Sequence, residues 1–217
     1  MKKTRSPVES RGKISESTVR RLSSYLRLLH EAEARGQETI SSEELAERGG
    51  TTSAQVRKDL SFFGSFGKRG LGYSVPELLR EIEGILGLHR RWRVALVGAG
   101  KIGSALISYR NFQRRGFEIQ AVFDSDREKV GQVWGSQIIL PDEELERVLA
   151  ENQIEIVIVA VPGDAAQKVV DRVVRAGVRA ILNFAPVRLR VPDGVALRNV
   201  DMVMEMEGLT FALSSRE

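Results

Sequence analysis

The spacing of apolar residues changes along the chain, from a helical period near the N-terminus to short apolar runs in the second half. Four apolar residues of the first segment recur at intervals of three or four: Val19, Leu22, Leu26 and Leu29. This period predicts an amphipathic helix that begins near Ser15 and stops at Gly36, because glycine readily adopts the left-handed conformation that ends a helix.

Two shorter helices are predicted next, each by a hydroxyl residue that is followed three positions later by Glu or Gln. Ser41-x-x-Glu44 opens the first, and Thr52-x-x-Gln55 opens the second after a pair of glycines. In such a capping box the hydroxyl accepts a hydrogen bond from an otherwise unpaired N–H of the first turn. Two helices joined by so short a connection predict a helix-turn-helix.

The second helix of this pair has an apolar face and a basic face. Apolar residues recur at positions 56, 60 and 63, which turns Arg57, Lys58 and Ser61 toward the other side. Arginine and lysine can donate to guanine O6 and N7 in the major groove, while hydroxyls at the start of the helix can reach phosphates. The residues predicted to contact DNA here are Thr52, Ser53, Gln55, Arg57, Lys58 and Ser61.

The glycine-rich segment 64–75 carries alternating aromatic residues and predicts a β-hairpin with Lys68 and Arg69 at its tip. Beside a helix-turn-helix, such a basic hairpin is a wing that also contacts DNA. Three aromatic side chains of this region are expected in the core: Phe62, Phe63 and Phe66. Pro76 then begins a helix that runs to about Leu86. A small three-helix packing module with a charged surface is the alternative interpretation of this unit.

From about residue 93 onward, short apolar strands alternate with amphipathic helices. The predicted strands cover residues 93–97, 117–123, 137–140, 154–161 and 180–184, and the predicted helices cover 141–151 and 164–176. This alternation predicts an α/β domain with a parallel sheet that is covered by helices on both faces.

A glycine-rich turn, Gly98-Ala-Gly-Lys-Ile-Gly103, joins the first of these strands to a helix. In this spacing the first glycine permits a sharp turn, the second lets the backbone approach a pyrophosphate, and the third allows close packing of helix on strand. The helix N-terminus adds unpaired N–H groups and a partial positive charge. The turn residues predicted to hold a dinucleotide are Gly98, Ala99, Gly100, Lys101, Ile102 and Gly103.

Asp124 ends the next strand, about 20 residues beyond the last glycine, where a carboxylate accepts hydrogen bonds from the adenosine ribose. The order of strand, turn, helix, strand and acid predicts dinucleotide binding, and a turn with packing duties alone is the alternative. The carboxylate would repel a 2′-phosphate, which favours NAD(H) over NADP(H). The nearby Arg127 and Lys129 weaken that preference.

Composition fits a globular protein of one large or two small domains, since 42% of the 217 residues are hydrophobic. No apolar stretch reaches the roughly 18 residues that span a bilayer, and the charged N-terminus lacks the apolar core of a signal peptide. We therefore expect a cytoplasmic protein with no membrane segment. The absence of cysteine excludes disulfides, thiolate catalysis and cysteine metal sites, and we expect no metal site.

The formal net charge is +4, and basic residues outnumber acidic ones among the first 30 residues. Such clustering suits an acidic partner, although a solvated tail plus a charged helix face would give the same pattern. Residues 1–14 contain little apolar surface and are expected to form a mobile basic arm. At the other end, segment 199–213 is apolar and rich in methionine, which predicts a homodimer contact or, alternatively, packing on its own subunit.

Groups suited to hydride-transfer catalysis are missing from the nucleotide-binding half. A dehydrogenase needs an acid or base beside the nicotinamide, whereas the two histidines, His30 and His89, lie outside this half. The residues after Trp92 leave no room for a substrate domain. We therefore expect no catalytic residue and a protein in which NADH or NAD+ is a signal to the DNA reader. An NAD-dependent dehydrogenase and a coenzyme A-binding module are the alternatives.

Four stretches resemble motifs of the Rex family of redox-sensing transcriptional repressors, in the family's order. They are Ala54-Gln-Val-Arg-Lys-Asp-Leu-Ser61, Arg69-Gly-Leu-Gly-Tyr73, Gly98-Ala-Gly-Lys-Ile-Gly103 and Ile181-Leu-Asn-Phe-Ala-Pro186. The likeness runs from about residue 19 to residue 213. It implies a winged-helix domain, a Rossmann domain and a C-terminal helix swapped between the subunits of a homodimer.

The sequence departs from the family pattern at two places in the N-terminal unit. Thr51 replaces the apolar residue usual after the helix-turn-helix glycine, and Phe62-Phe63 replaces a common Tyr-Phe pair. Residues 1–14 lie outside the resemblance.

The resemblance also implies roles for individual residues. Arg57 and Lys58 would contact operator bases, and Lys68 and Arg69 would contact the DNA backbone or minor groove. The residues implied near the nicotinamide are Val161, Pro162, Asn183, Phe184, Ala185 and Pro186. The residues implied to couple the domains are Arg27, Tyr109 and Asp201.

The expected domains are a basic arm (1–14), a winged-helix domain (15–88), a Rossmann NAD(H)-binding domain (89–198) and a C-terminal dimerisation helix (199–217). In our hypothesis, the two recognition helices of the homodimer match successive major grooves of a pseudo-palindromic operator only in an open form that NAD+ tolerates or favours. The neutral ring of NADH is buried at lower cost than the charged ring of NAD+, so NADH closes the dimer and misaligns the helices.

Overall fold

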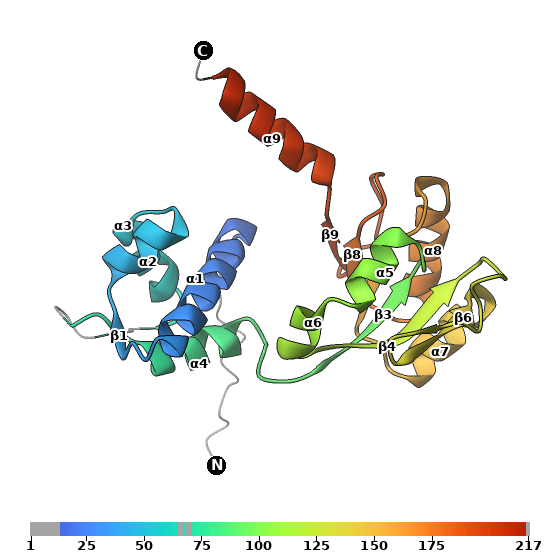
Figure 1. Ribbon diagram of the computed structural model, residues 1–217, viewed down its shortest axis with the longest axis horizontal. Coiled ribbons are helices and arrows are strands. Elements are labelled where there is room, and N and C mark those ends of the chain that lie inside the picture. Colours follow the sequence, from blue (N-terminus) through green and yellow to red (C-terminus); the bar gives the residue numbers. More distant parts are fainter. Residues whose placement is uncertain (1–13, 65–66, 68–70, 216–217) are drawn as a thin grey trace. The chain divides into compact units, whose positions relative to one another are not determined.

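The computed structural model describes residues 14–64, 67 and 71–215 (Figure 1). The chain divides into two compact units, residues 1–90 and residues 91–217. Among the helices of the described residues, none has both the length and the apolar character needed to cross a membrane.

The N-terminal unit consists of helices and one small antiparallel sheet (Figure 1). The helices are α1 (Glu16–Ala34), α2 (Ser42–Gly49), α3 (Ser53–Ser61) and α4 (Val75–Ile85), and the strands are β1 (Thr39–Ile40) and β2 (Tyr73–Ser74). The predicted caps Ser41 and Thr52 are confirmed, because each side chain accepts a hydrogen bond from a first-turn N–H, and Ser15 caps α1 in the same way. The predicted helix-turn-helix is therefore present as α2 and α3.

The core of this unit is formed where α1 packs on α2 and α4. Leu22, Leu26 and Leu29 are buried as predicted, but Val19 is 39% exposed. Val19 lies in the first turn of α1, outside the buried cluster to which the later leucines belong. The periodicity therefore identified the helix correctly but assigned Val19 to its buried face, whereas the buried residue of the first turn is Thr18.

One prediction about segment 62–75 is wrong. Phe62 was expected in the core but is 54% exposed, because it caps the C-terminus of α3 two positions after the buried Leu60. Phe63 packs against the core, and Phe66 lies outside the described residues. Strand β2, predicted as part of the hairpin in segment 64–75, pairs with β1 between α1 and α2, and residues 65, 66 and 68–70 of that hairpin lie outside the described residues.

The C-terminal unit is built on a seven-stranded sheet with the order β5-β6-β4-β3-β7-β8-β9, in which β5 alone runs antiparallel to its neighbour. The strands are β3 (Trp92–Val97), β4 (Phe117–Asp124), β5 (Val133–Trp134), β6 (Gln137–Pro141), β7 (Ile156–Val159), β8 (Ala180–Asn183) and β9 (Ala196–Asn199). The predicted parallel α/β sheet is confirmed. Strand β7 is shorter than predicted, and β5 and β9 were not predicted.

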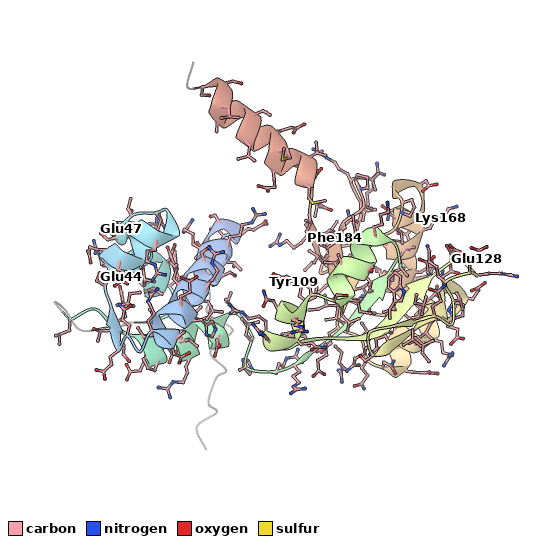
Figure 2. The ribbon with its side chains drawn as sticks, viewed as in Figure 1. Glu44, Glu47, Tyr109, Glu128, Lys168 and Phe184 are labelled. Atoms are coloured by element: carbon pink, nitrogen blue, oxygen red, sulfur yellow. The ribbon has the colours of Figure 1, made fainter. Side chains whose placement is uncertain are left out.

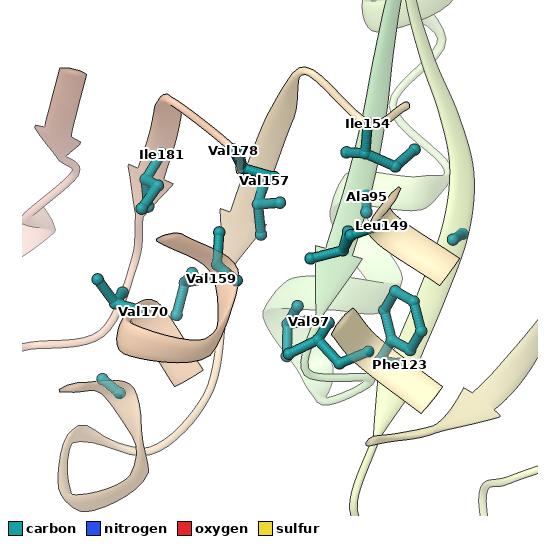
Figure 3. Close-up of a cluster of buried hydrophobic side chains, with 14 of the residues drawn as sticks. Ala95, Val97, Phe123, Leu149, Ile154, Val157, Val159, Val170, Val178 and Ile181 are labelled. Carbon is teal, nitrogen blue, oxygen red and sulfur yellow. The ribbon is translucent and has the colours of Figure 1, made fainter. Parts of the chain in front are cut away.

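Helices cover both faces of this sheet (Figure 1). They are α5 (Lys101–Ile107), α6 (Arg110–Arg114), the 3-10 turn η1 (Asp142–Glu144), α7 (Leu145–Glu151) and α8 (Gly163–Arg175). Residues of α7 and α8 pack with alternate residues of the central strands, including Val97, Phe123 and Val159 (Figure 3). The intervening residues, such as Leu96 and Val122, pack with α5 and α6 on the opposite face. A sheet buried on both sides explains why these strands are continuous apolar runs.

Strand β9 changes the account of the C-terminal segment. Asn199, expected at the start of a separate tail, pairs with Asn183 and so belongs to the sheet. The chain then forms α9 (Met202–Ser214), which Asp201 caps by accepting hydrogen bonds from the N–H groups of Val203 and Met204 at 2.9 and 3.3 Å. No residue of α9 is buried.

Candidate functional site

The glycine turn has the geometry that its spacing predicts. Gly98 has φ +106°, and a Cβ built there would lie 2.4 Å from the carbonyl oxygen of Ala160. A Cβ at Gly103 would lie 2.1 Å from the carbonyl oxygen of Gly98. A Cβ at Gly100 would meet no atom within 4 Å. Two glycines are therefore required by the turn itself, whereas the third leaves open space beside the backbone.

Asp124 reaches this turn from the end of β4. Its Oδ2 accepts a hydrogen bond from the N–H of Ala99 at 2.7 Å, and its Oδ1 accepts one from the N–H of Asp126 at 2.8 Å. Lys129 Nζ lies 3.4 Å from Oδ2 and 3.3 Å from a carboxylate oxygen of Asp126. The carboxylate predicted to hold the ribose thus also fixes the glycine turn to the neighbouring strand.

The charges beside Asp124 stabilise one another. Burial alone would lower the pKa of Lys129, but its hydrogen bond with Asp126 and the charge of Asp124 outweigh burial and raise that pKa. A hydrogen bond from the N–H of Glu128, followed by the contact with Lys129, lowers the pKa of Asp126. Lys129 therefore stays protonated, and its charge is balanced by the carboxylates of Asp124 and Asp126. It would attract a 2′-phosphate less strongly than an unpaired lysine.

A cleft of about 680 Å³ opens at the carboxyl ends of β3, β4 and β7. In open parallel sheets ligands bind at the carboxyl ends of the strands where the strand order reverses. In this sheet the order reverses at β3, which has β4 on one side and β7 on the other. The structure brings together the predicted residues Gly98, Gly100, Asp124, Val161 and Pro162 as part of its lining. The cleft is therefore the candidate nucleotide site.

The other predicted turn residues do not line this cleft. Ala99 is buried, and Lys101 and Ile102 are exposed in the first turn of α5. Gly103 supports the turn through packing. Ligand contacts from these residues remain predictions.

The segment after β8 is held by a buried amide. Asn183 is fully buried, and its Nδ2 donates to the carbonyl oxygen of Ala185 at 3.0 Å and to Oδ1 of Asn199 at 2.9 Å. Its Oδ1 accepts from the N–H of Ala185 at 2.9 Å. Phe184 packs with the α5 side of the sheet (Figure 2), and Pro186 is exposed. Asn183 thus shapes this segment, and contact with nicotinamide remains a prediction for all four residues from 183 to 186.

Sequence reasoning missed the polar residues that α8 brings to the cleft. Asp164, Lys168 and Arg172 recur every four residues and line it together (Figure 2 labels Lys168). Arg172 also binds Glu146 through two hydrogen bonds of 2.8 and 2.6 Å, and it lowers the pKa of Glu146 to about 2. The sequence could have indicated these residues, because α8 was predicted to begin at the carboxyl end of a central strand, where ligands bind in parallel sheets.

In the N-terminal unit, α3 presents the predicted basic face. Arg57, Lys58 and Ser61 are exposed. The guanidinium of Arg57 donates from Nη1 to Ser42 Oγ at 2.9 Å and to a carboxylate oxygen of Glu43 at 3.2 Å, so both partners of this side chain lie on α2. Lys68 and Arg69, the predicted wing contacts, lie outside the described residues.

The residues predicted to contact DNA at the start of α3 differ in exposure and in hydrogen bonding. Thr52 caps the helix, and Ser53 is partly exposed. Gln55, predicted to contact DNA, donates from Nε2 to Oδ1 of Asp59 at 2.8 Å. Its amide is therefore engaged by a buried carboxylate of the same helix, and that carboxylate is a polar feature that sequence reasoning did not identify.

The three residues implied to couple the domains occupy different elements. Arg27 is exposed on α1 of the N-terminal unit, and Asp201 caps α9 of the C-terminal unit. Tyr109, labelled in Figure 2, precedes α6 as its N-cap residue. It is 51% exposed and contacts Phe112 edge-to-face, with 5.2 Å between the ring centroids. In the described parts of the chain, no group of three or more His, Cys, Asp or Glu side chains could hold a metal ion.

Two family models match the chain. The model described as "Putative DNA-binding protein N-terminus" matches residues 13–61, and the model described as "CoA binding domain" matches residues 89–187. These matches fall on the unit that contains α3 and on the unit that contains the glycine turn.

Several curated relatives match nearly the whole chain. A protein named "Redox-sensing transcriptional repressor Rex" from Desulforamulus reducens is 49% identical over 205 residues, which are 94% of this chain and 98% of the relative. A protein of the same name from Carboxydothermus hydrogenoformans is 51% identical over 199 residues, which are 92% of this chain and 96% of the relative.

Solved structures give the same picture. The crystal structure of RSP in complex with β-NAD+ and operator DNA superposes on this chain with a TM-score of 0.90. The two sequences are 38% identical, and the match covers 94% of each chain. The crystal structure of RSP in complex with β-NADH is 36% identical with a TM-score of 0.87, covering 94% of this chain and 96% of that one. A further structure, of RSP described as a Rex-family repressor, has a TM-score of 0.88.

Proposed function

Since this chain belongs to the Rex family of redox-sensing transcriptional repressors, we propose that it holds operator DNA through α3 and leaves it when NADH fills the cleft of the C-terminal unit. The protein is a regulator and not an enzyme, so the dehydrogenase alternative is set aside. In this proposal it acts in the cytoplasm, on genes whose products consume NADH.

The observation that carries the proposal is the open backbone at Gly100 beside a cleft that ends at Asp124. The pyrophosphate would approach Gly100 and the first N–H groups of α5, which carry partial positive charge. The carboxylate of Asp124 would accept hydrogen bonds from the adenosine ribose. The relatives RSP with β-NADH and RSP with β-NAD+ support a nicotinamide dinucleotide over coenzyme A as the ligand.

Discrimination between the two oxidation states would arise from the environment of the nicotinamide ring. We place that ring near Val161, Pro162 and the segment 183–186, where apolar side chains predominate. NAD+ has a positive ring whose burial costs desolvation energy, whereas the dihydronicotinamide ring of NADH is neutral. NADH would therefore favour a form in which the ring is enclosed, and this form would be the one that releases DNA.

On the DNA side, Arg57 and Lys58 would read base edges in the major groove, and Thr52, Ser53 and Ser61 would contact phosphates. Arg57 would exchange its α2 partners for a guanine. Arg57→Ala is then expected to lower operator affinity by about 1 to 3 kcal/mol and to relax base preference at one position. Unchanged operator affinity in this variant would contradict the assignment of α3 as the recognition helix.

A homodimer would present two such helices to a pseudo-palindromic operator. Helix α9 is the proposed contact, because it exposes a continuous set of large apolar side chains. These are Met202, Val203, Met204, Met206, Leu209, Phe211 and Leu213, each at least 60% exposed. A monomer that exposes so much apolar surface is unusual, and a second copy that exchanges α9 would cover it. In this dimer Arg27, Tyr109 and Asp201 would couple the nucleotide and DNA domains.

The test of the proposed function is release of the full-length protein from DNA selected for binding to it. Sub-stoichiometric labelled duplex would be titrated with NADH, NAD+, NADPH and coenzyme A while the bound fraction is followed by fluorescence anisotropy. We expect release by NADH at concentrations at which NAD+ leaves the complex intact. Release by coenzyme A alone, or equal release by NADH and NAD+, would contradict the proposal.

A further inference from the structure

A buried carboxylate lies on the inner side of the recognition helix. Asp59 of α3 has no exposed surface, although it is flanked in sequence by the exposed Lys58 and the buried Leu60. A buried carboxylate is costly unless charged or polar partners satisfy its oxygen atoms. Its partners therefore show what holds α3 in place.

The main partner is an arginine of α1. Arg21 Nε donates to Asp59 Oδ2 at 2.6 Å, and Arg21 Nη2 donates to Oδ1 at 2.7 Å. Two parallel hydrogen bonds of this kind fix both the distance and the relative orientation of the groups. Arg21 lies 38 positions before Asp59 in the chain, so the pair ties two separate helices together.

Two further donors complete the carboxylate's coordination. Tyr25 of α1 donates its hydroxyl to Oδ2 at 3.1 Å, and Gln55 of α3 donates from Nε2 to Oδ1 at 2.8 Å. Each oxygen of Asp59 thus accepts two hydrogen bonds. Burial alone would raise the pKa of Asp59, but the hydrogen bonds from Arg21, Gln55 and Tyr25 outweigh it and lower that pKa. The carboxylate is ionised at neutral pH.

The apolar contacts of α3 cannot give the same orientation. Helix α3 has nine residues, and its buried apolar residues are Val56 and Leu60. Apolar packing is non-directional, so it tolerates a small rotation of a short helix. A rotation of about 15° moves a group roughly 6 Å from the helix axis by about 1.5 Å. That displacement exceeds the range of about 0.5 Å within which hydrogen bonds form well.

We propose that Asp59 and Arg21 are positioning residues for operator recognition, which fix the rotation of α3 on α1 and thereby aim Arg57 and Lys58 at the base edges. The proposal deepens the proposed function and rests on it, because it requires α3 to be the helix that reads DNA. The pair itself contacts no DNA. Its loss should therefore reduce base discrimination and leave the electrostatic attraction to phosphates intact.

The test compares Asp59→Asn with the wild type in the full-length protein. We expect affinity for selected operator DNA to fall at least about 10-fold, while affinity for non-operator duplex stays within about twofold. The slope of log affinity against log salt concentration should not change, because it reports phosphate contacts. NADH affinity should also be unchanged. A general loss of folded protein would lower both DNA affinities together, so the ratio separates positioning from stability.

Two variants on α1 sharpen this comparison. Arg21→Lys keeps the positive charge but removes the two-pronged geometry, and it should lose operator discrimination as Asp59→Asn does. Arg20→Gln is the matched control, because Arg20 is the neighbouring arginine, its side chain is 76% exposed, and it pairs with Glu16 on the same helix. We expect Arg20→Gln to retain the wild-type ratio of operator to non-operator affinity.

The outcomes are distinguishable. If Asp59→Asn and Arg21→Lys both retain the wild-type ratio, the positioning proposal is overturned while operator binding and its release by NADH stand. Should Asp59→Asn fail to fold, Arg21→Lys alone decides, because it leaves a cation beside the carboxylate. If Arg57→Ala also leaves operator affinity unchanged, the fault lies in the proposed function, since α3 is then not the recognition helix.

Discussion

The glycine turn of the C-terminal unit and the recognition helix of the N-terminal unit are held in place by opposite means. At the turn, the backbone takes its course because Gly98 and Gly103 have no side chain to collide with nearby carbonyl oxygens. At α3, orientation depends on side chains that are present, namely the hydrogen-bonded pair of Asp59 and Arg21. The glycines of the turn lie within six residues of one another, although Gly98 also approaches the carbonyl oxygen of Ala160, whereas the paired side chains of α3 and α1 lie 38 positions apart.

This difference decides how each region should respond to substitution. The glycine turn should lose its conformation when a Cβ is added at Gly98 or Gly103, where a backbone carbonyl oxygen occupies the space. Helix α3 should lose its fixed orientation when either Asp59 or Arg21 is replaced by a residue that cannot form the paired hydrogen bonds.

The largest effect is expected for Gly103→Ala. The new Cβ would lie 2.1 Å from the carbonyl oxygen of Gly98, so α5 must move away from β3. We expect a loss of about 3 kcal/mol in the free energy of unfolding, together with loss of measurable NADH binding. Denaturant unfolding and calorimetric titration would measure these changes. Wild-type stability in this variant would contradict the close packing of turn and helix.

A smaller and more selective effect is expected for Gly100→Ala. A Cβ there meets no protein atom within 4 Å, so stability should change by less than about 1 kcal/mol. The methyl group would occupy the approach of the pyrophosphate, and NADH affinity should fall about 10-fold to 100-fold. Gly84→Ala is the control, because its Cβ also meets nothing and Gly84 lies in α4 of the other unit. Equal NADH affinity in the two variants would show that the pyrophosphate does not lie at Gly100.

At the recognition helix, alkaline titration should reveal the buried network. Burial, and then the hydrogen bond and charge of Asp59, raise the pKa of Tyr25 to about 12. Because the folded-state pKa is raised, the tyrosine's contribution to stability is complete below about pH 10 and is lost as pH rises through 12. In the ultraviolet absorbance of tyrosinate, Tyr25→Phe should remove a step near pH 12. Tyr109→Phe, at an exposed position, should leave that step in place.

The smallest effect is expected where an ion pair lies on the surface. Arg147 of α7 pairs with Glu144 and Glu151, but its side chain is 57% exposed and solvent screens its charge. We expect Arg147→Gln to change the free energy of unfolding by less than about 0.5 kcal/mol. A thermal unfolding scan beside Arg21→Lys would test this. A larger loss in Arg147→Gln would show that burial does not distinguish the two arginines.

The same contrast explains which features the sequence could reveal. Alternating apolar runs predicted the central strands and the helices on both sheet faces, and the glycine spacing located the turn together with Asp124. These are local patterns. The Arg21–Asp59 pair left no such pattern, because either residue alone is typical of a charged helix face. The pairing of β2 with β1 also depends on a contact between distant segments.

Other differences have equally physical causes. Strand β9 has one partially buried residue in its four positions, so it lacks the apolar run that marks the central strands. Asn183 resembled a ligand-binding amide at a strand end, yet its hydrogen bonds are satisfied within the protein by Ala185 and Asn199. Lys168 and Arg172 were overlooked because charged residues on an amphipathic helix usually face solvent. Their place at the cleft follows from where α8 begins.

The central claim is that one ligand's oxidation state sets the strength of DNA binding. It is tested most directly by holding the total concentration of NADH plus NAD+ constant, varying their ratio, and measuring the affinity of the full-length protein for its selected operator. We expect affinity to fall as the NADH fraction rises, and Gly100→Ala to shift this fall to a higher total nucleotide concentration. An operator affinity that is the same at every ratio would contradict the central claim.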